Sequence, residues 1–211
     1  MRISHLSIIR EAEYHALQKV ALDGVILDVG GGSHSEYHSL ITGDHTFYSI
    51  NISPDATPDK IVDIEHPFLL ASDTYDHAIC MNVLEHVFEF ENVIRETSRV
   101  IKRGGKIVLA TPMVYKIHGS PDDYLRYTES ALRRVAKKCN LTVEAIQPLG
   151  SGFFSVGMQM MRSAIPSGFI WIVCKRIAIG LDNFLNYISP GYRTLSRQIP
   201  LGYITILRKD N

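Results

Sequence analysis

The sequence predicts a single α/β domain, spanning residues 1–211 and built on a mostly parallel sheet. Its 211 residues, of which 45% are hydrophobic, can bury one substantial core but are too few for two ordinary domains. Between residues 25 and 148, short apolar runs alternate with segments of helical spacing, which is typical of a parallel sheet covered by helices. The predicted fold class is therefore α/β with helices between the strands.

Seven short apolar runs are the predicted strands. They are Val25–Val29, Phe47–Ile50, Lys60–Val62, Tyr75–Met81, Lys106–Ala110, Thr142–Gln147 and Tyr203–Arg208. A short helix is expected near the N-terminus. Asn92–Ile101 has helical spacing and ends in a basic turn followed by glycine, and in Thr128–Cys139 the first residue can act as the N-cap.

Segment 151–199 differs from the rest of the chain and is predicted to be a helical insertion before the last strand, folded over the site as a lid. Pro166, Ser167 and nearby basic residues interrupt its apolar run, which argues against a membrane span. Peripheral membrane contact through 163–181 stays open, because apolar residues there lie beside two basic ones.

Charge and cysteine content exclude several classes of protein. The 22 basic and 22 acidic residues balance, so nucleic acid is not an expected partner. Residues 151–211 nevertheless carry 7 basic and only 2 acidic side chains. The three cysteines form no C-x-x-C pair, and the N-terminal stretch contains no apolar signal region. We expect a cytoplasmic protein, with the inner face of the membrane as a second option; the oligomeric state is left open.

A glycine-rich turn follows the first strand in the segment Val25–Ser33 (V-I-L-D-V-G-G-G-S). Glycines let a ligand approach the backbone, and a helix after the turn would direct free N–H groups at it. A dinucleotide fingerprint would need glycine in place of Ser35. Asp28 suits a positively charged amino group better than a pyrophosphate. A plain strand-to-helix turn is the alternative interpretation.

Polar residues also follow the next three strands. Asn51, Asp63 and Asn82 stand where the second, third and fourth predicted strands end. Each alone is explained equally well by capping or turn formation. Because ligands of open α/β sheets bind at the carboxyl ends of the strands, their joint placement predicts a binding site.

Five strings carry a family resemblance over nearly the whole chain: V-I-L-D-V-G-G-G, Y-S-I-N-I-S-P, Y-D-H-A-I-C-M-N-V-L-E-H-V, R-V-I-K-R-G-G-K-I-V-L-A-T-P and H-G-S-P-D-D-Y-L-R-Y-T. The sequence resembles the class I S-adenosylmethionine-dependent methyltransferases, and within them the methyltransferase 11/23-type group associated with glycan biosynthesis. The resemblance implies a Rossmann-like methyltransferase fold, with a seven-stranded sheet whose last strand is antiparallel and helices on both faces.

The resemblance also implies S-adenosyl-L-methionine as the cofactor and a set of residues that bind it. These are Asp28, Gly30, Gly31 and Gly32 for the methionine part, Asn51 and Ile52 for the ribose and adenine edge, Asp63 and Ile64 for the adenine, and Asn82 near the sulfonium. The third glycine of the family pattern is His34 here, and the usual acid after the second strand is Asn51.

The segment Thr111–Thr128, after the fifth strand, holds the predicted acceptor site. Methyl transfer from a sulfonium needs alignment rather than a protein nucleophile, and a hydroxyl acceptor benefits from a general base. We predict His118 as the base, with Asp122 or Asp123 as the alternative base or as its orienter. The predicted substrate-binding residues are Tyr124, Arg126 and Tyr127. Each could instead be an ordinary loop residue.

No metal is expected, because the nine histidines are scattered and none has zinc-site spacing. The predicted reaction is methylation of a hydroxyl on a small molecule or glycan, including lipid-linked or nucleotide-linked ones. The alternatives are a non-catalytic cofactor-binding or partner subunit of the same fold and, less favoured, a nicotinamide-dependent oxidoreductase. An antiparallel last strand between the fifth and sixth strands would favour methyl transfer over the oxidoreductase.

Overall fold

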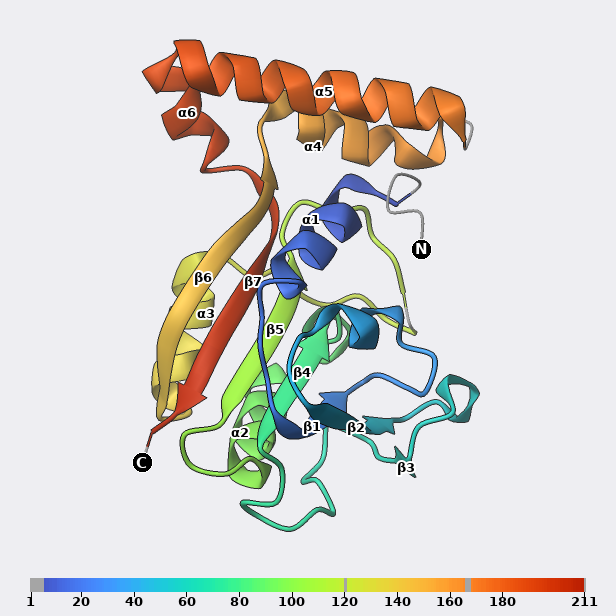
Figure 1. The fold of residues 1–211 in the computed structure, drawn as a ribbon, viewed down its shortest axis with the longest axis vertical. Helices are drawn as coiled ribbons and strands as arrows, with labels where there is room; N and C mark the ends of the chain where they lie inside the picture. Colours follow the sequence, from blue (N-terminus) through green and yellow to red (C-terminus); the bar gives the residue numbers. More distant parts are fainter. Residues whose placement is uncertain (1–5, 120, 166–167, 211) are drawn as a thin grey trace.

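The computed structural model describes residues 6–119, 121–165 and 168–210, so Ser120, Pro166 and Ser167 lie outside the described residues. A single seven-stranded sheet has the order β3-β2-β1-β4-β5-β7-β6 (Figure 1). Its strands are β1 (Gly24–Val29), β2 (His45–Asn51), β3 (Lys60–Ile61), β4 (His77–Met81), β5 (Lys106–Pro112), β6 (Leu141–Ser151) and β7 (Pro200–Lys209). All seven predicted strands are confirmed, with shifts at their ends.

The last strand has the orientation that distinguishes the two enzyme classes considered above. β7 pairs antiparallel with β5 on one side and with β6 on the other, while β1 to β5 pair parallel wherever they are neighbours. This arrangement is the Rossmann-like methyltransferase fold. It disfavours the nicotinamide-dependent oxidoreductase.

Alternate strand residues point to opposite sides of the sheet, so both of its faces carry apolar side chains. Helices cover both faces. α2 (Phe90–Val100) and α3 (Glu129–Lys138) pack on one face, where they meet side chains such as Leu27 and Leu109. α1 (Ile8–Leu17) packs on the other face against Ile79 and neighbouring strand residues (Figure 1). The predicted N-cap is confirmed, since the backbone N–H of Ala131 donates to Thr128 Oγ1 over 3.3 Å.

The connection after β1 differs from the prediction. The expected α-helix after the glycine turn is a five-residue 3-10 helix, Glu36–Leu40. The hydroxyl of Tyr37 and the ring of His38 both bond back to Asp28, at the end of β1, and these bonds hold the segment close to the strand. The turn therefore does not open a regular α-helix.

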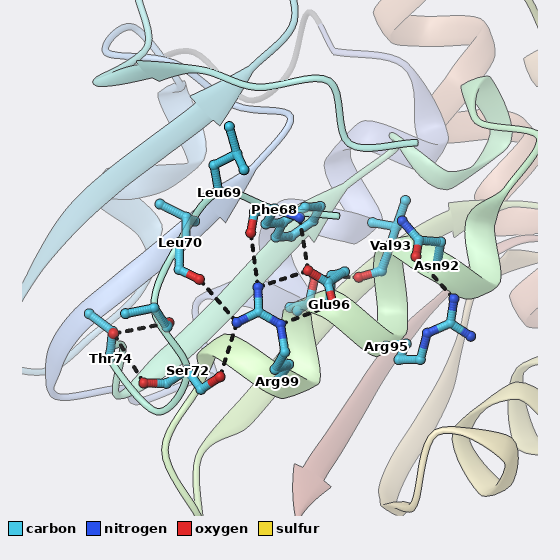
Figure 2. Close-up of polar contacts among 12 residues, drawn as sticks. Phe68, Leu69, Leu70, Ser72, Thr74, Asn92, Val93, Arg95, Glu96 and Arg99 are labelled. Carbon is cyan, nitrogen blue, oxygen red and sulfur yellow. Dashed lines mark hydrogen bonds and ion pairs between the residues drawn. The ribbon is translucent and has the colours of Figure 1, made fainter. Parts of the chain in front are cut away.

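Residues 62–76, between β3 and β4, contain no helix and are fastened to α2 by one arginine (Figure 2). All five N–H donors of Arg99 are used: two bonds of 3.0 and 2.8 Å reach the Glu96 carboxylate, and three of 3.0 Å reach the carbonyls of Phe68 and Leu70 and the hydroxyl of Ser72. Hydrogen bonds from Arg99 hold the pKa of Glu96 below its ordinary value. We call this cluster the Arg99 clamp.

We expect Arg99→Ala to lower the free energy of unfolding by about 2 kcal/mol, since two loop carbonyls lose their side-chain donor and Glu96 keeps only the backbone N–H of Phe68. Denaturant melts would measure this loss. Because the pKa of Glu96 is lowered by folding, its stabilising effect is present above the pKa of an unfolded glutamate and is lost as the pH falls through the folded value. The difference between wild type and variant should therefore narrow at about pH 3 relative to pH 7.

The control for this prediction is Arg95→Ala, which removes an exposed arginine of the same helix whose guanidinium bonds Asn92 (Figure 2). It should change stability by less than about 0.5 kcal/mol. Equal losses in the two variants would contradict the structural role given to the Arg99 clamp.

The insertion predicted at 151–199 is helical. It consists of α4 (Phe153–Met160), a short 3-10 turn, α5 (Phe169–Ile188) and α6 (Pro190–Ser196), and α5 lies across one end of the sheet beside α4 (Figure 1). A fully buried ion pair of 2.5 Å joins Lys175 of α5 to Glu11 of α1. Asp182 of α5 accepts the backbone N–H groups of Phe154 and Ser155 at the start of α4. Among the described residues, no helix is both long and apolar enough to cross a membrane.

Candidate functional site

The carboxyl ends of β1, β2, β3 and β4 meet around a cavity of about 310 Å³, which we call the first cavity. Its lining includes eight of the predicted site residues: Gly30, Asn51, Ile52, Asp63, Ile64, Asn82, Asp122 and Tyr124. A neighbouring cavity of about 300 Å³ runs along the glycine turn and is lined by Gly31, Gly32 and His34 among others. The prediction that strand-end residues gather at one place is thus matched by their positions.

The glycine turn leaves no room for side chains. A Cβ built on Gly32 would lie 2.0 Å from the carbonyl oxygen of Ala56, and one built on Gly31 would lie 1.8 Å from Asp28 Oδ2. Gly30 has a φ of 82°, in the left-handed region that favours glycine. All three positions therefore require glycine for the turn to keep this shape.

Asp28 lies beneath the turn. Its carboxylate is fully buried, accepts the Tyr37 hydroxyl at 2.9 and 3.0 Å, and lies 2.6 Å from Nε2 of His38. Burial and the adjacent carboxylate raise the pKa of Tyr37, so its hydroxyl stays protonated and donates. In this structure Asp28 supports Gly31 from below, and it does not line the described cavities.

Asn51 also supports the turn. Its Nδ2 donates to the carbonyls of Gly30 at 2.7 Å and Gly31 at 3.1 Å, and its Oδ1 accepts the backbone N–H of Ser53 at 2.9 Å. An acid at this position could not donate to carbonyls. The amide in place of the usual acid is therefore explained by the turn that it holds, and the side chain still lines the first cavity.

The loop after β3 forms the far wall of the first cavity. Asp63 accepts the backbone N–H of Glu65 at 3.0 Å and pairs with His66, also at 3.0 Å. Glu65 accepts the backbone N–H of Phe88 at 2.8 Å. Ile52, which is exposed, and Ile64, which is buried, line the same cavity and add apolar surface beside Asp63. The Arg99 clamp begins only a few residues later and keeps this wall in place.

Asn82 separates the first cavity from a second one. It follows β4 with a φ of 55°, a left-handed conformation that asparagine tolerates better than most residues, and it lines both cavities. The second cavity has a volume of about 100 Å³ and is lined by residues of α1, of the segment after β4 and of the loop after β5, including Glu13, Glu85, Tyr115 and His118.

Two carboxylates in the second cavity were not predicted. Glu85 and Glu13 are buried, and burial raises the pKa of both, that of Glu85 to about 7. Glu13 lies 3.2 Å from the guanidinium of Arg10. Glu85 was visible in the string L-E-H, but nothing in the sequence places the N-terminal Glu13 at this site.

His118 meets one of the two acids predicted to orient it, Asp123. Its backbone N–H donates to Asp123 Oδ2 at 2.8 Å, and its Nδ1 lies 3.4 Å from the same oxygen. Arg126 binds Asp123 through two nitrogens and holds the pKa of that carboxyl well below its usual range. Asp123 is therefore an ionised group that holds the backbone of His118 and lies near its ring, and Arg126 is already engaged within the loop.

Asp122 and Tyr124 line the first cavity, and the tyrosine hydroxyl donates to Asp122 Oδ2 at 2.9 Å. Tyr127 requires a correction. It is buried, packs against Phe90, and donates its hydroxyl to the carbonyl of Leu84 at 2.7 Å. Its aromatic ring fills the core beneath the helix α2, so it is a packing residue rather than one that faces the cavities.

Three comparisons with known proteins bear on this site. Residues 27–109 match the family model described as a methyltransferase domain. No curated protein matches the sequence.

Solved structures resemble the fold over nearly the whole chain. A methyltransferase chain in the complex with the Haloferax volcanii Trm112 methyltransferase activator has a TM-score of 0.63 and 15% identity, covering 97% of this chain and 90% of that one. An S-adenosylmethionine-dependent methyltransferase from Mesorhizobium loti has a TM-score of 0.60 and 14% identity, covering 94% and 98%. The [4+2]-cyclase SpnF has a TM-score of 0.57 and 16% identity, covering 95% and 81%. At these identities the likeness shows the fold.

Proposed function

We propose that this protein is an S-adenosylmethionine-dependent methyltransferase that methylates a hydroxyl group of a small molecule or glycan. The methyltransferase domain match and the S-adenosylmethionine-dependent neighbour indicate the cofactor. The observation that carries the proposal is the position of Asn82, which lies between the first cavity, at the strand ends, and the second cavity, with its buried acids. A cofactor in the first cavity would place its reactive end beside an acceptor in the second.

The residues present fit such a cofactor. The glycine turn has no side chain that would obstruct a ligand, and Ile52 and Ile64 offer apolar surface to a flat base. Asp63 offers a carboxylate beside them. S-adenosylmethionine, when bound, supplies an electrophilic methyl group.

The protein's own part in the reaction is alignment and proton removal. Bound S-adenosylmethionine would supply the methyl group that leaves its sulfur for the acceptor oxygen, and a ring nitrogen of His118 would take up the proton that this hydroxyl loses. Asp123 is a positioning residue for His118, through the backbone contact of 2.8 Å and the ring contact of 3.4 Å. The loop after β5 lines both cavities and would limit the access of water to the reacting groups.

Calorimetric titration with S-adenosylmethionine tests the cofactor, and incubation with a panel of glycans, nucleotide sugars and lipid-linked sugars tests the acceptor. We expect binding of one cofactor per chain and methylation of at least one hydroxyl acceptor. Absence of cofactor binding at about 1 mM would overturn the proposal.

A second candidate is a cofactor-binding protein of the same fold that transfers no methyl group. It is favoured by one observation, the structural likeness to the [4+2]-cyclase SpnF, which shows that this fold is not confined to methyltransferases. Cofactor binding without methylation of any acceptor in the panel would support it.

We also propose that the outer face of the insertion lies on an anionic lipid surface. Exposed apolar residues recur at helical spacing along α5: Phe169, Ile170, Val173, Ile177, Leu181, Phe184 and Ile188. The polar residues Lys175 and Asp182 of the same helix point inward, to partners in α1 and α4. Arg176 is exposed beside the apolar stripe, although its guanidinium also pairs with Glu11 of α1 at 3.1 Å, and a cation at this edge suits the lipid headgroup boundary. A lipid-linked acceptor would reach the protein from this side.

We expect the protein to sediment with vesicles containing phosphatidylglycerol and much less with pure phosphatidylcholine vesicles. Ile177→Asn should weaken vesicle binding about tenfold, because an apolar side chain leaves the interface. The matched control is Ile61→Asn, since Ile61 of β3 is 60% exposed and Ile177 is 57% exposed. Equal effects of the two substitutions, or no vesicle binding by the wild type, would contradict a lipid-facing role for α5.

A further inference from the structure

Three side chains between the first and second cavities have the chemistry of a metal site. Glu85, His86 and His118 each offer one ligand atom, and these atoms lie within 4.8 Å of one another. Oε1 of Glu85 is 3.9 Å from Nε2 of His86, and the two imidazole rings meet edge to face with centroids 4.8 Å apart. Ligands about 2.1 Å from a tetrahedral zinc ion are about 3.4 Å apart, so side-chain shifts of about 1 Å would close the cluster on an ion.

The contact made by the other nitrogen of His86 fixes which atom is free to coordinate. Nδ1 lies 2.6 Å from the carbonyl oxygen of Asp122, and a carbonyl can only accept a hydrogen bond. Nδ1 therefore carries the proton, and Nε2, on the side of Glu85, keeps its lone pair. A histidine that donates its second ring N–H to a backbone carbonyl is the usual arrangement around a bound metal.

Glu85 supplies an independent observation. The residue is 0% exposed, and within the described part of the chain neither carboxylate oxygen has a hydrogen-bond partner. Buried carboxylates are normally paired, hydrogen-bonded or bound to a metal. The carboxylate lines the second cavity together with His118 and Glu13, so a second carboxyl group faces the same small space.

We propose that Glu85, His86 and His118 bind a divalent transition-metal cation at the junction of the two cavities. One carboxylate and two imidazoles are a donor set that suits zinc, iron, cobalt or manganese rather than calcium. No metal was expected from the sequence, because two of these ligands are adjacent in the chain and the third follows 32 positions later, in the loop after β5, a spacing that matches no familiar zinc motif.

The role of this cation rests on the proposed function and revises one step in it. A cation bound here would hold the acceptor oxygen beside Asn82 and lower the pKa of the hydroxyl by its charge. His118 would then be a metal ligand, and the hydroxyl proton would pass instead to the carboxylate of Glu13, which lines the same cavity. Cofactor binding at the strand ends would not depend on the cation.

Titration of the purified, chelator-treated protein with Co²⁺, followed by visible absorption, tests the site without any activity measurement. Zn²⁺ is then added to displace the Co²⁺. We expect one Co²⁺ per chain and at least tenfold weaker binding in His86→Gln and in His118→Gln. Glu85→Gln should weaken binding similarly, and the melting temperature of each variant in chelator shows that it is folded.

His66→Gln is the matched control, because His66 forms a contact of 3.0 Å with the carboxylate of Asp63 but belongs to no three-ligand group within the described part of the chain. It should bind Co²⁺ as the wild type does. Unchanged binding in both His86→Gln and His118→Gln, or no stoichiometric binding by the wild type, overturns the metal site. Cofactor titration on the same samples separates the two proposals, since metal binding without cofactor binding would overturn only the proposed function.

Discussion

Gly32→Ala is expected to weaken S-adenosylmethionine binding about a hundredfold. The added Cβ would lie 2.0 Å from the carbonyl oxygen of Ala56 and 2.9 Å from its carbonyl carbon, both backbone atoms that cannot turn aside. Relieving such an overlap costs about 3 kcal/mol, which corresponds to about a hundredfold in affinity. Calorimetric titration would measure the change, and a thermal melt would show whether the variant still folds.

The control is Gly157→Ala in α4, where a new Cβ would meet nothing within 4 Å. Alanine favours the helix, so this variant should bind the cofactor like the wild type and melt at the same or a higher temperature. Cofactor affinity in Gly32→Ala equal to that of Gly157→Ala would contradict the assignment of the glycine turn to the binding site.

Asn51→Asp should weaken cofactor binding about thirtyfold, although it restores the acid that the family pattern usually carries. The amide donates to the carbonyls of Gly30 and Gly31, over 2.7 and 3.1 Å. A carboxylate would lose both bonds and set its charge against two carbonyl oxygens. The loss of these bonds costs about 2 kcal/mol, and it destabilises the turn at which we propose that the cofactor binds.

Asn183→Asp makes the same chemical change at an exposed position of α5 and should leave cofactor affinity unaltered. Tighter binding in Asn51→Asp would show that the acid contacts the ribose and that the turn is held by other groups. Asn51→Ala, which removes the donor without adding charge, should have a cofactor affinity between those of the wild type and Asn51→Asp.

The strands and the strand-end residues were predictable because they depend on short-range patterns. Apolar runs between turn residues identified all seven strands. Thr128 marked the start of its helix because a threonine at that position can cap it, and its side chain does accept the N–H of Ala131. Residues such as Asp63 and Asn82 were found because parallel strands end at one edge of the sheet. Each of these features depends on the residue pattern of one short segment and on the direction in which parallel strands run.

The remaining features depend on which distant segments meet. Glu13 lies in a helix whose own pattern shows only that it has a buried face, and its place beside Asn82 follows from how α1 packs. Tyr127 looked like its neighbours in a polar loop, and only the contact with the Leu84 carbonyl shows that it belongs to the core. The short 3-10 segment after β1 likewise reflects bonds from Tyr37 and His38 to Asp28, which no periodicity encodes.

The helix α1 contacts both α5, through the buried ion pair between Lys175 and Glu11, and the second cavity, through Glu13. Glu11 fastens α5 on one side, and Glu13, two residues further on, forms part of the wall of the second cavity. A helix of ten residues is stiff over so short a distance. A displacement of α5 would therefore reach the wall of the second cavity through α1, which links the helix proposed to face lipid with the proposed acceptor site.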